Sequence, residues 1–114
     1  MISADEAKEG RLVRSVHAPE DLLPAARAIA REIAENTAPV SVALSRQMLW
    51  RMLGADHPMQ AHRVDSRAIN SRGASDDARE GVMSFLEKRP AAFPVKVSDG
   101  LPEVFPDWQD PQFS

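Results

Sequence analysis

The placement of the nine prolines limits where this chain can be helical. Proline has no amide hydrogen for the helix ladder and clashes with the preceding turn. Five prolines fall in the last stretch, residues 90–114, together with four of the six aromatic residues. Such a stretch cannot form a long helix. We predict an extended, Pro-rich tail over residues 90–114, which either docks through its aromatic rings or stays loose.

Before the tail, the chain predicts a mainly α fold of about four to five helices. Ser3 and Glu6 have the spacing of a capping box, which predicts a short helix that ends by Gly10. The run from Leu12 to Val16 predicts either a brief strand or an extended link. Proline, serine and glycine positions then set four further expected helices: from Pro19 to Glu35, from Pro39 to about Leu53, from Pro58 to about Gly73, and from Ser75 to Arg89.

The expected helix from Pro39 to Leu53 is apolar on more than one side. A helix of this kind is normally buried between neighbouring elements or at an interface between subunits. It therefore indicates that this part of the chain packs closely against other surfaces.

Composition excludes several classes of protein. The chain has 114 residues, a formal net charge of −3 and a pI of about 5.6, so it lacks the basic excess of nucleic-acid-binding or lipid-binding proteins. It has no cysteine, which excludes disulfides and thiolate zinc sites. No stretch has the length and apolar character of a membrane span or a signal peptide. We expect a cytoplasmic protein without a membrane or nucleic-acid partner.

No self-contained active site follows from the residue types. The histidines, His17, His57 and His62, have no metal-binding spacing and are expected to be surface or capping residues. The acidic cluster Asp76, Asp77 and Glu80 lies where a helix is expected to begin, and negative charge there is stabilised by the helix dipole. We assign no catalytic residue and no metal site.

One group of residues suggests ligand binding. Lys88 and Arg89 follow Phe85 at the end of the last expected helix. Two cations beside a ring could clamp a phosphate while the ring stacks on a base. The alternative is that the two cations only complement the helix C-terminus. Gly81 lies inside the same helix, where glycine lowers helix stability by about 1 kcal/mol relative to alanine. Its presence there is explained either by the close approach of another group or by chance.

Two segments resemble the late part of the crotonase (enoyl-CoA hydratase/isomerase) family. Residues 2–7, followed by Gly10 to Val13 and Val16, are similar to a family segment of the form A-x-E-A…G-L-V…V, although Arg11 is an addition to it. Residues 80–93 resemble the closing family signature through Glu80-Gly81, Phe85, Glu87-Lys88-Arg89 and Phe93. With Asn36-Thr37-Ala38-Pro39 between them in family order, the resemblance covers roughly residues 2 to 94.

The resemblance implies a division of the chain and a reaction. Residues 1–18 would end the crotonase core segment, residues 19–89 would form the C-terminal helical region that builds the trimer interface and a lid, and residues 90–114 would form a tail that packs aromatics on a neighbour. The oxyanion hole and catalytic glutamates of the family belong to a preceding half that this chain lacks. The resemblance implies a coenzyme A thioester as the substrate of a full-length parent, and the chain alone is expected to lack catalysis.

Site residues and assembly also follow from the resemblance. Phe85 and Lys88, with Arg89 beside them, would contact the adenosine-phosphate end of coenzyme A across a subunit boundary, and Ile69 would help to line the acyl pocket. A homo-oligomer, either a trimer or a dimer of trimers, is implied. The alternative from the residues alone is a stand-alone helical oligomerisation module without enzymatic activity. A helical DNA-binding regulator is disfavoured by the negative charge.

Overall fold

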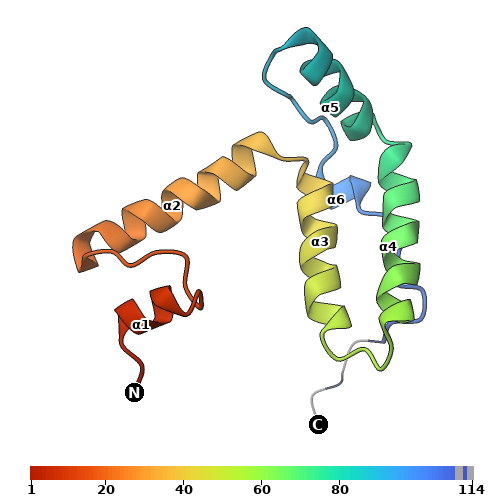
Figure 1. Ribbon diagram of the computed structural model, residues 1–114. Helices are drawn as coiled ribbons and strands as arrows, with labels where there is room; N and C mark the ends of the chain where they lie inside the picture. The colour runs from red at the N-terminus through yellow and green to blue at the C-terminus, as the bar shows by residue number, and fades with distance from the viewer. Residues whose placement is uncertain (110–111, 113–114) are drawn as a thin grey trace. The chain divides into compact units, whose positions relative to one another are not determined.

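In the computed structural model, which describes residues 1–109 and 112, every regular element among those residues is a helix (Figure 1). The predicted mainly α fold is confirmed. Pro111 and Phe113, which belong to the predicted tail, lie outside the described residues. The six helices are α1 (Ala4–Glu9), α2 (Pro19–Asn36), α3 (Pro39–Met52), α4 (Pro58–Gly73), α5 (Asp76–Glu87) and α6 (Val97–Gly100).

The chain forms two compact units, Met1–Glu35 and Asn36–Ser114. In the first, the predicted capping box is present: the Ser3 hydroxyl accepts a hydrogen bond from the Glu6 amide at 3.2 Å, and the Ser3 amide donates to the Glu6 carboxylate at 2.7 Å. The hydrogen bond from the Ser3 backbone lowers the pKa of Glu6. Residues 12–16 are an exposed link without a strand, and α2 runs through Pro24 unbroken.

The second unit is built on the pair of helices α3 and α4, which a short turn joins at one end (Figure 1). His57 caps the start of α4, because its ring Nδ1 accepts a hydrogen bond from the Met59 amide at 3.1 Å. Val40 and Leu44 on α3 are one turn apart, as are Val64 and Ala68 on α4, and all four are buried. This spacing places one apolar stripe of each helix in a shared core.

The tail completes that core. Val104 and Phe105 are buried with the α3 and α4 residues, at 1% and 6% exposure. Burying a valine or a phenylalanine side chain contributes about 1.5–3 kcal/mol each. The tail is therefore docked on α3 and α4 at Val104 and Phe105. The expectation that the tail packs its aromatics on a neighbour is corrected at Phe105, because this ring fills the core of its own chain.

Two features differ from the sequence-based expectations. The tail holds one short helix, α6, which packs against α3. In addition, α3 buries only the stripe at Val40 and Leu44, whereas Leu49, Trp50 and Leu53 at its end and just beyond are 76%, 70% and 84% exposed. The apolar character of α3 therefore exceeds what the interior of this chain uses.

Gly100, at the end of α6, lies closely against Val95 of the same tail and in contact with Val40 of α3. A Cβ atom built on Gly100 would overlap Cγ1 of Val95 and lie 3.5 Å from Cγ2 of Val40. We therefore expect Gly100→Ala to destabilise the protein by about 1–3 kcal/mol, as overpacking does in other cores. A thermal melt followed by circular dichroism measures this.

Gly54→Ala is the matched control, because no atom lies within 4 Å of a Cβ built there. Equal melting temperatures for the two variants would show that the close approach of Val95 to Gly100 does not constrain the tail.

Candidate functional site

Phe85 and Lys88 meet on the surface at the C-terminal end of α5. The Lys88 Nζ lies 4.1 Å from the centroid of the Phe85 ring, and this ring is 70% exposed. A cation over an exposed ring gains about 0.5–1 kcal/mol, enough to favour the pairing without fixing it. The structure thus brings together an ammonium group and an aromatic ring, the two groups that the sequence predicted here.

The backbone of Lys88 is in an unusual conformation. Its φ of 56° and ψ of 39° put it in the left-handed region, where it caps α5 by donating its amide to the Phe85 carbonyl. This conformation costs a residue with a side chain roughly 1–2 kcal/mol, and glycine is the usual residue at such a helix end. Strain of this kind is concentrated at functional sites. Arg11 has the same φ of 56°, so the backbone conformation alone does not assign a role to the Lys88 side chain.

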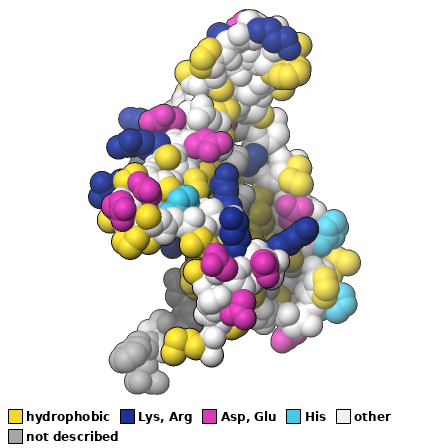
Figure 2. Space-filling view, turned by 60° about the vertical axis from the view of Figure 1, so that its left-hand side comes forward, with side chains coloured by type: hydrophobic (Ala, Val, Ile, Leu, Met, Phe, Trp, Pro, Cys, Tyr) yellow, Lys and Arg dark blue, Asp and Glu magenta, His cyan; other side chains and the backbone are white. Residues whose placement is uncertain are grey.

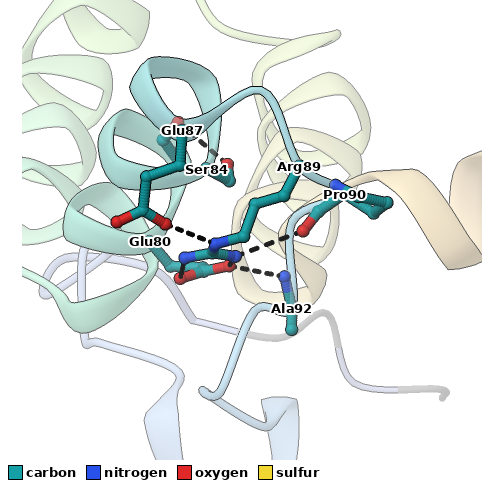
Figure 3. Close-up of polar contacts among 7 residues, drawn as sticks. Glu80, Ser84, Glu87, Arg89, Pro90 and Ala92 are labelled. Atoms are coloured by element: carbon teal, nitrogen blue, oxygen red, sulfur yellow. Dashed lines mark hydrogen bonds and ion pairs between the residues drawn. The ribbon is translucent and has the colours of Figure 1, made fainter.

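Arg89 is arranged differently from Lys88. Its guanidinium donates to both oxygens of Glu80, at 2.5 and 2.9 Å, and to Glu87 at 2.6 Å (Figure 3). Hydrogen bonds from Arg89 and then from the Ala92 amide lower the pKa of Glu80 to about 2, and the hydrogen bond to Glu80 raises the pKa of Arg89. The contact of Arg89 with coenzyme A stays a prediction, and in this structure its donors serve Glu80 and Glu87.

Asp77 and Glu80 hold the first part of the tail against α5. Glu80 accepts a hydrogen bond from the Ala92 amide at 2.7 Å, and the buried Asp77 accepts one from the Val95 amide at 3.1 Å. We call these contacts, with the Glu80–Arg89 ion pair, the α5–tail latch. Asp76 and Asp77 lie in the first turn of α5, as predicted. The contacts of Asp77 and Glu80 with tail amides 18 and 12 residues away were not predicted.

Gly81 of α5 lies near the Phe93 ring of the tail. A Cβ atom built on it would lie 3.7 Å from the Phe93 ring, which is an ordinary contact distance. Phe93 therefore approaches Gly81, yet the space beside Gly81 is large enough for the Cβ atom of an alanine. The structure gives no steric reason for glycine at this position.

Ile69 lies apart from these residues, on α4. Its side chain is 64% exposed and lines a cavity of about 190 Å³ with residues of α3, a cavity that includes neither Phe85 nor Lys88. The role of Ile69 in an acyl pocket stays a prediction.

Residues 1–109 and 112 contain no group of three His, Asp or Glu side chains placed to hold a metal ion. Within the same residues, no helix has both the length and the apolar character needed to cross a membrane.

The latch predicts a pH-dependent stability. We expect Glu80→Gln to lower the melting temperature at neutral pH, because the amide cannot replace the charge-assisted bonds to Arg89. The pKa of Glu80 falls on folding from 4.5 to about 2, so its contribution is complete above about pH 4.5 and is lost as the pH falls through about 2. The difference between the melting temperatures of wild type and variant should shrink over that range.

Glu87→Gln serves as the control, because Glu87 contacts Arg89 without holding the tail. A pH-independent difference, or an equal loss in both variants, would contradict the role assigned to Glu80.

Comparisons with known proteins identify the family. The family model described as "Enoyl-CoA hydratase/isomerase" matches residues 1–96. The chain is 42% identical over 84 residues to an enoyl-CoA hydratase of Alternaria alternata, covering 74% of this chain and 28% of that protein. It is 36% identical over 88 residues to a short-chain-enoyl-CoA hydratase of Clostridium acetobutylicum, covering 77% and 33%, and 32% identical over 95 residues to a putative enoyl-CoA hydratase of Thermus thermophilus, covering 82% and 36%. The chain thus spans about a third of the length of these relatives. This chain belongs to the enoyl-CoA hydratase/isomerase family.

Proposed function

We propose that this chain is the C-terminal helical part of a protein that acts on acyl-CoA thioesters, and that the end of α5 contacts the adenosine-phosphate end of coenzyme A. The family membership supports the substrate class. The observation that carries the contact is the Lys88 ammonium over the exposed Phe85 ring, held by a left-handed backbone.

The chemistry of the pair fits this part of coenzyme A. A lysine ammonium binds phosphate as a compact positive charge, and an exposed ring offers a flat apolar surface to adenine. The latch fixes Arg89, the next residue, and so restricts where Lys88 can reach. The site therefore supplies one positive charge and one stacking surface. Its proposed contribution is to the binding of coenzyme A.

Catalysis is proposed to need more than this chain. Its relatives are hydratases, so the proposed reaction of the whole protein is addition of water to a 2-enoyl-CoA. Acyl-thioester chemistry needs donors placed at the developing oxyanion and a placed acid or base. The two carboxylates of the latch, Asp77 and Glu80, accept bonds from Val95, Ala92 and Arg89 instead. We expect the chain alone to leave crotonyl-CoA unhydrated.

An assembly role is proposed for the end of α3. The exposed apolar residues there, Leu49, Trp50 and Leu53, are costly to leave in water, and apolar patches of this kind mark interaction surfaces. Figure 2 shows hydrophobic side chains exposed among charged ones. Homo-oligomerisation, as a trimer or a dimer of trimers, is proposed through this surface, and a module that only oligomerises is the alternative. A cytoplasmic location also stays a prediction.

Binding of coenzyme A tests the α5 site. In a titration of the ¹⁵N-labelled chain with coenzyme A, we expect saturable shifts at Phe85 to Lys88. Lys88→Gly should weaken the affinity about fivefold to tenfold, because one charge-assisted contact is lost. The same substitution should raise the melting temperature, because glycine removes the left-handed strain.

Arg11→Gly is the matched control, because Arg11 has the same φ of 56°. It should raise the melting temperature and leave the affinity unchanged. Wild-type affinity in Lys88→Gly would overturn the proposed contact, and wild-type affinity in Phe85→Ala would remove the stacking role.

Light scattering tests the assembly surface. We expect the chain to associate at about 100 µM and Leu53→Ser to reduce this association, because Leu53 is 84% exposed at the end of α3. Leu12→Ser, at 74% exposure in the other unit, is the control and should have no effect. A wild-type chain that stays monomeric would contradict an assembly role.

A further inference from the structure

A groove lies between α4 and the part of the tail that follows the buried Phe105. It encloses a cavity of about 370 Å³, and its lining includes Arg63 and Arg67 from α4 and Trp108 from the tail. The family match ends at residue 96, so the tail side of this groove lies beyond the matched segment. It uses none of the residues assigned to coenzyme A.

The α4 wall of the groove is cationic. Arg63 and Arg67 are one helical turn apart, so their like charges face the same side and disfavour each other. Neither guanidinium has a hydrogen bond or an ion pair with the described residues, and both side chains are exposed. Asp107 lies on the opposite wall and offsets one of the two charges. The lining therefore keeps an excess positive charge that an anion would stabilise.

The tail wall is aromatic. Arg51 of α3 lies over both tail rings, with its guanidinium carbon 4.5 Å from the Phe105 centroid and 5.1 Å from the Trp108 centroid. These contacts hold Trp108 beside α4, where the ring remains 36% exposed.

The chemistry of the two walls indicates which kind of ligand the groove would bind. Guanidinium groups pair with the oxygens of phosphate through parallel hydrogen bonds, and an indole face accepts a planar ring. The volume falls at the small end of ligand pockets, which run from about 300 to 1,000 Å³. We propose that the groove formed by Arg63, Arg67 and Trp108 binds a small molecule that carries a phosphate next to a planar ring, such as an aryl phosphate or a nucleotide.

Phenyl phosphate is the probe that tests the groove. The Trp108 indole N–H resonance, assigned by its persistence in Trp50→Phe, is followed in the full chain during the titration. We expect a saturable shift of this resonance. The affinity for phenyl phosphate should be at least about fivefold higher than that for inorganic phosphate or for phenol, because each of these two molecules can make only half of the contacts. Arg63→Gln and Arg67→Gln should each weaken binding of phenyl phosphate about fivefold.

Arg46→Gln is the charge-matched control, because Arg46 is exposed on α3 and lines a different cavity. It should bind phenyl phosphate as the wild type does, and so should Lys88→Gly, which separates this site from the proposed coenzyme A contact. Adenosine monophosphate and coenzyme A, titrated in Lys88→Gly, distinguish a free nucleotide from coenzyme A as the source of the phosphate. The absence of a saturable shift up to about 10 mM, or equal weakening by Arg46→Gln, would overturn the proposal.

Discussion

Burial of Val104 and Phe105 against α3 and α4 is the interaction on which the rest of the second unit depends. Two helices that pack together do not cover all of the apolar surface that they share, and the part that neither helix covers stays open to water. The tail covers this part and so places Gly100 against Val40 and Trp108 against Arg51, both on α3. Without the docked tail, α3 and α4 would expose their shared core, and the groove beside Arg63 and Arg67 would lose one wall.

The α5–tail latch links this core to the candidate coenzyme A contact. Asp77 and Glu80 hold residues 92–95, and these lead directly into α6 and the buried part of the tail. The latch also fixes Arg89, so Lys88 is held between a helix end and a restrained neighbour. A residue in a strained conformation needs such support from both sides. The backbone position of Lys88 thus depends on contacts made elsewhere.

Local patterns predicted the helices well, because their signals lie within three or four residues. Ser3 with Glu6, and Ser75 before α5, are caps that the sequence displays directly. The docked position of the tail was left open, because Val104 and Val40 are far apart in sequence and an apolar residue does not reveal which surface buries it. The same applies to the site: Phe85 and Lys88 are near in sequence and were predicted together, whereas Glu80 with Ala92 and Asp77 with Val95 were not.

The late position of Val104 and Phe105 in the sequence also affects synthesis. A ribosome makes α3 and α4 well before it adds the residues that complete their core, and domains that wait for late segments expose apolar surface in the meantime. The contacts between Val40 on α3 and the tail are long-range, and such contacts slow folding. Until Val104 and Phe105 have been made, the apolar stripes of α3 and α4 lack the side chains that complete their core.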